Sequence, residues 1–342
     1  MENSSNGETA NMSHEYTYEY DEVCDKKNVA RIGSVAVPLV FSLVILLSLM
    51  GNILVLVNLG VHSLQVKSRT LSLIRNLAIS DLIFTAGLPF WSCQFIWGWT
   101  FGDVMCKGVS FVFSVGFYSS IVFMMMITLW RYLGWVRPIF ARNSTWPKPA
   151  AWVLSILLGL PALFQNSVIS DTYDPNLLYC KHNSKKAILA ATYQQNILFV
   201  VASSFMCFCN IRSFQILYRH LHFRRGYRNT KITFWLMVVF FIGWAPYNIV
   251  IFLQSLSYYH IKDFTDCNMS DNLDYALYAC TMLAFSHCCF NTVFDIITWR
   301  TFQRNWRQIS LCLCHQIHTN TQPNSMYSLE SVERNDNQDT VM

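Results

Sequence analysis

Seven stretches of this chain are apolar over about 20 residues or more, the length that an α-helix needs to cross the hydrocarbon core of a membrane. They lie near residues 31–60, 70–97, 104–134, 150–169, 187–218, 231–257 and 273–298. Hydrophobic residues make up 53% of the 342 residues and charged residues only 13%, against roughly 25% charged in an average soluble domain. The sequence therefore predicts an all-α membrane protein, a seven-transmembrane helix bundle over residues 31–298.

Basic residues gather in every second connection between these windows. They are Lys67 and Arg69, then Arg137, Arg142 and Lys148, then Arg219, Arg224, Arg225, Arg228 and Lys231, and finally Arg300, Arg304 and Arg307. The positive-inside rule places such segments in the cytoplasm. With an odd number of spans, the N-terminus is then extracellular.

The two ends of the chain differ from the bundle in composition. Residues 1–30 form an acidic extracellular tail, and residues 299–314 form a short basic and aromatic stretch that suits an amphipathic eighth helix at the membrane surface. Cys312 and Cys314 are candidate palmitoylation sites there. Residues 315–342 are polar and are expected to be a disordered cytoplasmic tail. Glycosylation sequons on the predicted outer face begin at Asn3, Asn11 and Asn268.

Four cysteines fall on the predicted outer face, which is the oxidising side of the membrane. We expect a bridge between Cys106, which opens the third window, and Cys180, which follows the fourth. A bridge between Cys24 and Cys267 would tie the tail to the rim of the bundle. The sequence alone leaves the connectivity open.

A polar cluster is expected deep in the bundle. Asp81 is an acid in the middle of the second window, and an intramembrane acid marks a functional site by default. Asn52, Ser120 and Asn291 could surround it. In the sixth window, Pro246 removes a backbone hydrogen bond and predicts a kink that could act as a hinge, with Trp244 beside it.

Several of these motifs resemble the rhodopsin-like class of G-protein-coupled receptors, and the resemblance covers nearly the whole chain. The markers are Gly51-Asn52, Leu77-Ala78-Ile79-Ser80-Asp81, Trp152 and Trp244-Ala245-Pro246. Within that class, the chain is similar to chemokine receptors in Leu88-Pro89-Phe90-Trp91, Trp97-Gly98-Trp99-Thr100-Phe101-Gly102-Asp103 and Phe285-Ser286-His287-Cys288-Cys289-Phe290-Asn291. Tyr193-Gln194-Gln195-Asn196 and Leu273-Asp274-Tyr275-Ala276-Leu277 are similar to the lymphotactin (XC) branch.

The resemblance implies a plasma-membrane receptor for a basic chemokine of the lymphotactin type. Its partners would be an inhibitory heterotrimeric G protein, receptor kinases and arrestin. It also implies an allosteric sodium ion at Asp81 and a packing switch at Trp244. The implied ligand contacts within the bundle are Trp91, Trp97, Tyr118, Gln194, Tyr247, Gln254 and Tyr278.

The acidic tail supplies a second argument for a basic ligand. Tyr16, Tyr18 and Tyr20 lie among acids that include Asp21 and Glu22. Sulfation of these tyrosines would add further negative charge, and such a tail would steer a basic protein toward the receptor at a rate that falls with salt.

The chain departs from the family at the positions that the family uses for activation. The Asp-Arg-Tyr of the family is Trp130-Arg131-Tyr132 here, so Arg131 lacks the neighbouring acid. The Asn-Pro-x-x-Tyr motif becomes Asn291-Thr292-Val293-Phe294-Asp295, and Asn210 replaces the tyrosine after Cys209. Thr281 stands where many chemokine receptors have Glu. Asp295 could pair with Arg131, because an unpaired intramembrane charge is costly.

These departures leave two alternatives open. Either the receptor couples to the inhibitory G protein, or it is an atypical scavenger that binds and internalises chemokine without coupling. Other classes fit less well. The last window contains no lysine for a retinal Schiff base, and there are no internal repeats or rings of charge typical of transporters or channels. No phosphate loop or zinc motif points to an enzyme, and no nucleic-acid partner is expected.

Overall fold

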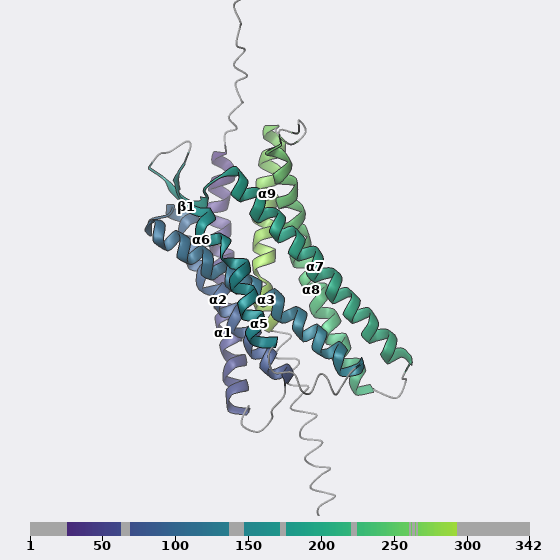
Figure 1. Cartoon of the computed structure of the whole chain (residues 1–342). Coiled ribbons are helices and arrows are strands. Elements are labelled where there is room, and N and C mark those ends of the chain that lie inside the picture. Colours follow the sequence, from purple (N-terminus) through teal and green to yellow (C-terminus); the bar gives the residue numbers. More distant parts are fainter. Residues whose placement is uncertain are drawn as a thin grey trace, which may run out of the picture.

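The computed structural model describes residues 26–62, 69–136, 147–171, 176–219, 224–259, 261, 264 and 266–292. The predictions made for the tail residues, for Cys24, for Asp295 and for the helix over 299–314 lie outside these ranges. The described chain forms a bundle of long helices with a short hairpin at one end (Figure 1).

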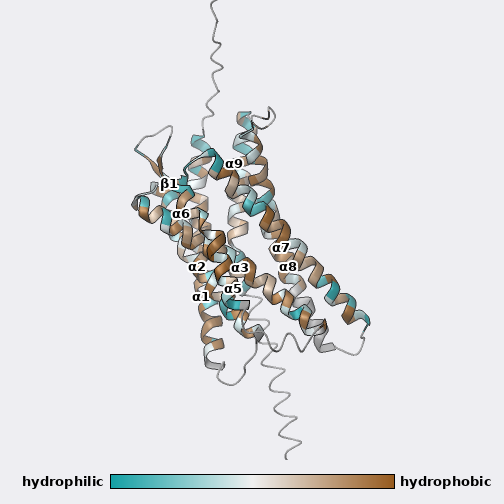
Figure 2. Cartoon of the chain, viewed as in Figure 1, coloured by the Kyte–Doolittle hydropathy of each residue, from teal (hydrophilic) through white to brown (hydrophobic). Residues whose placement is uncertain are grey.

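The helices are α1 (Lys27–His62), α2 (Arg69–Trp97), α3 (Gly102–Val136), α5 (Pro147–Gly159), α6 (Pro161–Gln165), α7 (Lys185–Arg219), α8 (Arg224–Ser257) and α9 (Cys267–Phe285). Six segments of the described chain are long and apolar enough to cross a membrane, with α5 and α6 counted as one. Apolar residues predominate along the helices, and hydrophilic residues gather toward their ends (Figure 2). Outward side chains such as Leu39, 73% exposed, and Met50, 70% exposed, would face lipid.

The fourth window ends earlier than its composition predicts. Helix α5 stops at Gly159, and Pro161 opens the single-turn helix α6, as expected for a residue that fits the first turn of a helix but not its interior. Asn166 then begins strand β1 (Asn166–Ser170). The expected helix over residues 166–169 is therefore wrong, because these residues pair with a second strand instead.

The seventh window contains a break that the apolar pattern does not reveal. Helix α9 ends at Phe285, Ser286 lies in a turn, and residues 287–292 are helical again. The Ser286 hydroxyl donates to the Leu283 carbonyl (2.6 Å), and the Cys288 thiol donates to the Phe285 carbonyl (3.3 Å). Side-chain donors thus compensate for the interrupted backbone ladder, as the apolar surroundings require.

A hairpin closes one end of the bundle. Strand β1 pairs antiparallel with β2 (Leu178–His182). The Cys106–Cys180 disulfide ties β2 to the start of α3, with the two Cα atoms 5.5 Å apart, so this predicted bridge is confirmed. Cys267 is also disulfide-bonded, while its expected partner lies outside the described residues.

Two further bonds hold β2 against the bundle. The Cys180 N–H donates to Oε1 of Gln94 on α2 (2.8 Å), and the Trp99 N–H donates to the Leu178 carbonyl (2.6 Å). The hairpin is therefore anchored to α2, to α3 and to the connection between them.

Helices α2 and α3 approach each other closely at Gly116. A Cβ atom at this position would lie 2.7 Å from Cα of Phe84 on α2. Small residues let backbones come this near in membrane bundles. The close approach positions Asp81 on α2 opposite Ser120 on α3.

Candidate functional site

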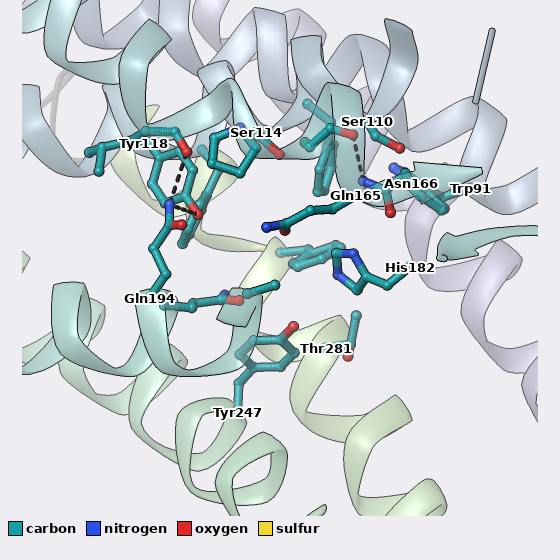
Figure 3. A pocket seen from close by; sticks show the side chains of 18 of the residues that line it. Trp91, Ser110, Ser114, Tyr118, Gln165, Asn166, His182, Gln194, Tyr247 and Thr281 are labelled. Carbon is teal, nitrogen blue, oxygen red and sulfur yellow. Dashed lines mark hydrogen bonds between the residues drawn. The ribbon is translucent and has the colours of Figure 1, made fainter. Parts of the chain in front are cut away.

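An inner cavity of about 370 Å³ lies between the helices at the hairpin end of the bundle. Its walls come from α1, α2, α3, α5, α6, α7, α8 and α9 and from both strands. Four of the predicted ligand contacts line it, namely Trp91, Tyr118, Gln194 and Tyr247. In Figure 3, Tyr247 and Thr281 lie across the cavity from Ser110 and Ser114.

Polar groups on the α3 and α7 walls are already paired with each other. The Gln194 amide donates to the Tyr118 hydroxyl (3.0 Å) and to the Leu158 carbonyl (2.9 Å), as Figure 3 shows for the first of these. Eight of the other lining residues are Phe, Tyr or Trp, with Phe113, Phe117 and Phe285 among them. Such a surface suits an apolar ligand segment that carries a few hydrogen-bonding groups.

An outer cavity of about 340 Å³ lies beside the inner one and shares four of its lining residues, His182, Ala191, Gln195 and Tyr247. The predicted contact Gln254 lines this outer cavity. Its other walls come from the start of α7, the end of α8 and the start of α9. The two cavities thus form adjoining chambers at one end of the bundle.

Two predicted contacts line neither cavity. Trp97 ends α2 with 65% of its surface exposed. Tyr278 instead packs edge-on against Phe95 with ring centres 5.8 Å apart, and the tyrosine ring fills the space beside Gly33. Both residues lie at the periphery of the chambers.

Other cavity residues carried no motif that singled them out. His182 lies two residues after Cys180 on the hairpin and faces both chambers. Burial lowers the pKa of His182 from 6.5, so its imidazole is neutral at pH 7. Its proximity to the bridged cysteine was the available signal. Asp274 lies in a stretch noted only for its family resemblance.

Trp244 lies at the floor of the inner cavity and is 1% exposed. Its ring centre is 4.7 Å from that of Phe117, 5.8 Å from that of Tyr247 and 5.1 Å from that of His287. Pro246 lies two residues further along α8, inside the helix. The predicted switch residue therefore contacts both the cavity and the helix break after Phe285.

The predicted polar cluster forms beneath this floor. Asp81, Ser120 and Asn291 are all buried. The Ser120 hydroxyl donates to one Asp81 oxygen (2.8 Å), and the Asn291 amide lies 3.3 and 3.1 Å from the two carboxylate oxygens. Nε2 of His287 lies 4.0 Å from Asp81 and makes no hydrogen bond.

Asn52 lies in an adjoining polar network rather than against Asp81. Its amide donates to the Ser48 hydroxyl (3.0 Å) and contacts the Cys288 carbonyl at 3.4 Å. Ser48 and Thr85 share a hydrogen bond (2.7 Å). Thr292, the residue in the position of the family's proline, donates to the same Cys288 carbonyl (3.1 Å).

The Asp81 cluster offers a donor set that fits a sodium ion. A hard cation prefers oxygen ligands, and the Asp81 carboxylate and Ser120 hydroxyl supply them. None of the hydrogen-bonding groups around Asp81 carries a permanent positive charge, so a small cation would offset a buried carboxylate. Within the described part of the chain, no group of three or more His, Cys, Asp or Glu side chains is arranged for a metal ion.

The opposite end of the bundle contains the unusual activation residues. Trp130 packs against the core, but its indole N–H makes no hydrogen bond, while Arg131 does interact with other groups. Tyr132 faces Phe208 with ring centres 6.3 Å apart. Asn210 is 2% exposed; its amide donates to the Met206 carbonyl (2.8 Å), and its side-chain oxygen is unpaired.

Comparison with known proteins agrees with this geometry. Residues 51–294 match the family described as 7 transmembrane receptor (rhodopsin family). The chain is 33% identical to human chemokine XC receptor 1 over 90% of both proteins. It is 31% identical to human C-C chemokine receptor type 4 over 94% of both. It is also 33% identical to mouse atypical chemokine receptor 2, over 86% of this chain and 80% of that protein.

Proposed function

Because the chain belongs to the rhodopsin family of seven-transmembrane receptors and, within it, to the chemokine receptors, we propose that it binds a basic chemokine of the lymphotactin type and signals through an inhibitory heterotrimeric G protein. It is a multi-pass membrane receptor and not an enzyme. The choice of lymphotactin rests on the similarity to the XC receptor and on the matching stretches in α7 and α9.

A continuous series of contacts from the cavity to the buried carboxylate supports signalling. Tyr247 on the cavity wall contacts Trp244, Trp244 contacts His287, and His287 approaches Asp81. A ligand that moves Tyr247 would therefore change the surroundings of the polar cluster. Agonist would favour the state in which the far end of α8 swings outward about Pro246, by no more than its differential affinity for that state.

In this proposal the hairpin end of the bundle is extracellular. The disulfide between α3 and β2 belongs on the oxidising side, and the basic connections belong in the cytoplasm. The acidic tyrosine-rich tail would then meet the ligand first. The glycosylation sequon at Asn268 agrees with this orientation, because that residue is exposed at the start of α9.

Sodium would act as a negative allosteric ligand at Asp81. When bound, the ion would balance the charge of the carboxylate. Ser120 and Asp81 would hold it, and Asn291 would hold the carboxylate in place through its amide. These contacts join α2, α3 and the segment after α9, so a rearrangement among them would change the affinity for sodium.

Receptor kinases and arrestin complete the proposed cytoplasmic partners. The tail after residue 318 contains phosphorylatable side chains, among them Thr319, Thr321, Ser325, Ser328, Ser331 and Thr340. Phosphorylation would add the charge that arrestin-type partners recognise. These residues serve either a coupled receptor or a scavenger.

The alternative function is an atypical scavenger that internalises chemokine without coupling. Asn210 supports it, because its buried amide donates to the Met206 carbonyl of its own helix and to the Met237 sulfur on α8 (3.7 Å), and it offers no hydroxyl across the bundle. Trp130 likewise places an uncharged indole beside Arg131. The similarity to atypical chemokine receptor 2 is in line with such a function.

Inhibition of cyclic AMP formation distinguishes a coupled receptor from a scavenger. Cells expressing the tagged receptor would be exposed to lymphotactin and to a panel of CC chemokines, with surface level and labelled-chemokine binding measured in parallel. We expect inhibition that pertussis toxin abolishes. Binding and uptake without inhibition would establish the scavenger, and failure of every chemokine to bind would refute the ligand class.

A further inference from the structure

The two chambers contain a single carboxylate among their described lining residues. It belongs to Asp274 on α9, in the outer cavity. Thr281, which replaces the glutamate of many family members, lies seven residues later and lines the inner cavity. Seven residues are about two helical turns, so Asp274 lies on the same side of α9, about 10 Å nearer the hairpin end.

Asp274 is already paired with a lysine of its own chain. Nζ of Lys26 lies 2.5 Å from one carboxylate oxygen and 2.8 Å from the Ser270 hydroxyl. The Gln254 amide donates to the other carboxylate oxygen (3.0 Å). The carboxylate is therefore oriented by α8 and neutralised by the residue that directly precedes α1.

Lys26 occupies a position that another ammonium group could take. Its side chain is 37% exposed and that of Asp274 is 23% exposed, and ion pairs with this access to water contribute only about 1 kcal/mol or less. The neighbouring His182 is neutral at pH 7, because burial lowers its pKa. Burial raises the pKa of Tyr258; the charge of Asp274 raises it further, and the charge of Lys26 lowers it. No fixed positive charge other than Lys26 lines the described walls of the outer cavity.

We propose that Asp274 receives the N-terminal ammonium group of the chemokine and that Lys26 is an internal competitor that the ligand displaces. This proposal rests on the proposed function and identifies Asp274 as the residue that pairs with the positive charge of the ligand in the outer cavity. Displacement releases the Lys26 side chain at the junction between the acidic tail and α1, so occupancy of the outer cavity is linked to the segment that meets the ligand first. The acceptor carboxylate lies in the outer cavity, so the ligand terminus inserts less deeply than it would to reach position 281.

Substitution of Asp274 and substitution of Lys26 should change ligand affinity in opposite directions, and this difference tests the competition. Labelled lymphotactin binding is measured on intact cells at matched surface levels. Asp274→Asn is expected to weaken binding about fivefold to tenfold, whereas Lys26→Gln strengthens it about twofold to fivefold. In the Asp274→Asn background, Lys26→Gln has no further effect. Lys186→Gln and Asp266→Asn, exposed charges at the same end of the bundle, are the matched controls.

Two further arms separate ligand contact from a structural role. Lymphotactin acetylated at its N-terminus should bind the wild-type receptor more weakly than unmodified lymphotactin. The Asp274→Asn substitution should not weaken the binding of the acetylated ligand further, which in a double-mutant cycle indicates a direct pair. The charge swap Lys26→Asp with Asp274→Lys restores an ion pair but should not restore binding.

The outcomes that overturn the inference are distinct from failure of the proposed function. Equal loss of binding in both single variants, or rescue by the charge swap, means that the pair only fastens the chain to α9. Unchanged binding in Asp274→Asn excludes the contact. If no chemokine of the panel binds wild type at all, the proposed function fails and the inference falls with it.

Discussion

The close backbone approach of α2 and α3 at Gly116 allows a sharp test of the fold through Gly116→Ala. The added Cβ would lie 2.7 Å from the Phe84 Cα atom, whereas ordinary contact begins at 3.4 Å. The Phe84 backbone nitrogen would lie closer still, so helices α2 and α3 would have to separate by about 1 Å, and a well-packed interface resists such overpacking at a cost of about 1–3 kcal/mol.

Gly108→Ala on the same helix is the matched control, because a Cβ there has no neighbour within 4 Å. Both variants gain the same helix propensity, about 1 kcal/mol, so the difference between them isolates the steric cost. On the scale of soluble proteins, about 2–4 °C per kcal/mol, Gly116→Ala should melt about 2–12 °C below Gly108→Ala.

The assay is thermal unfolding of the detergent-solubilised receptor, followed by a thiol-reactive dye or by retained ligand binding. Ser120 lies one turn after Gly116 and donates to Asp81, so the separation should also lengthen that bond. If Gly116→Ala melts at the same temperature as Gly108→Ala, the close packing of α2 on α3 is refuted.

Three further predictions follow from the site. Asp81→Asn should abolish the effect of sodium on agonist affinity, measured as labelled-chemokine binding in sodium chloride against choline chloride; retained sodium sensitivity would place the ion elsewhere. Replacing Cys106 and Cys180 together by Ala should cost about 2–5 kcal/mol and remove high-affinity binding at matched surface level, whereas Cys93→Ala, at a free cysteine, should bind normally. His182 has a pKa lowered by burial, so below about pH 6.5 the unfolded chain takes up a proton that the folded receptor excludes, and stability should fall as pH falls. His182→Gln should reduce this acid sensitivity in melting curves between pH 7.5 and about pH 5 while leaving the melting temperature at the upper pH little changed.

The long helices followed directly from the apolar windows. A chain in lipid must satisfy its backbone hydrogen bonds within each segment, so length and composition suffice to locate a span. The break at Ser286 and the early end of α5 depend instead on a few local side chains. Val168 and Ile169 are apolar enough for a span, yet they pair with β2, because Pro161 and the bridge at Cys180 redirect the chain.

The site was only partly predictable for a related reason. Asp81, Ser120 and Asn291 meet as expected, because each is a costly polar residue in an apolar window and such residues converge. The cavity wall depends on how each helix is rotated about its axis, which composition does not encode. Trp97 therefore lies outside both chambers, while His182 lines both and Asp274 lines the outer one, although neither was singled out by a motif of its own.

The anchored hairpin makes the entrance to the chambers asymmetric. Bonds to Gln94, Cys106 and the residues around Trp99 fix β2 on the α2 and α3 side. On the α8 and α9 side, Lys26 bonds to Asp274 and Ser270, and Gln254 bonds to Asp274. The α8 and α9 side, which no disulfide to the hairpin fixes in the described residues, is therefore where we expect the entrance to widen for a bulky ligand. Inhibitors that bind on the α8 and α9 side and prevent this widening should block large ligands more than small ones. Inhibitors bound beneath the hairpin should show no such dependence on ligand size.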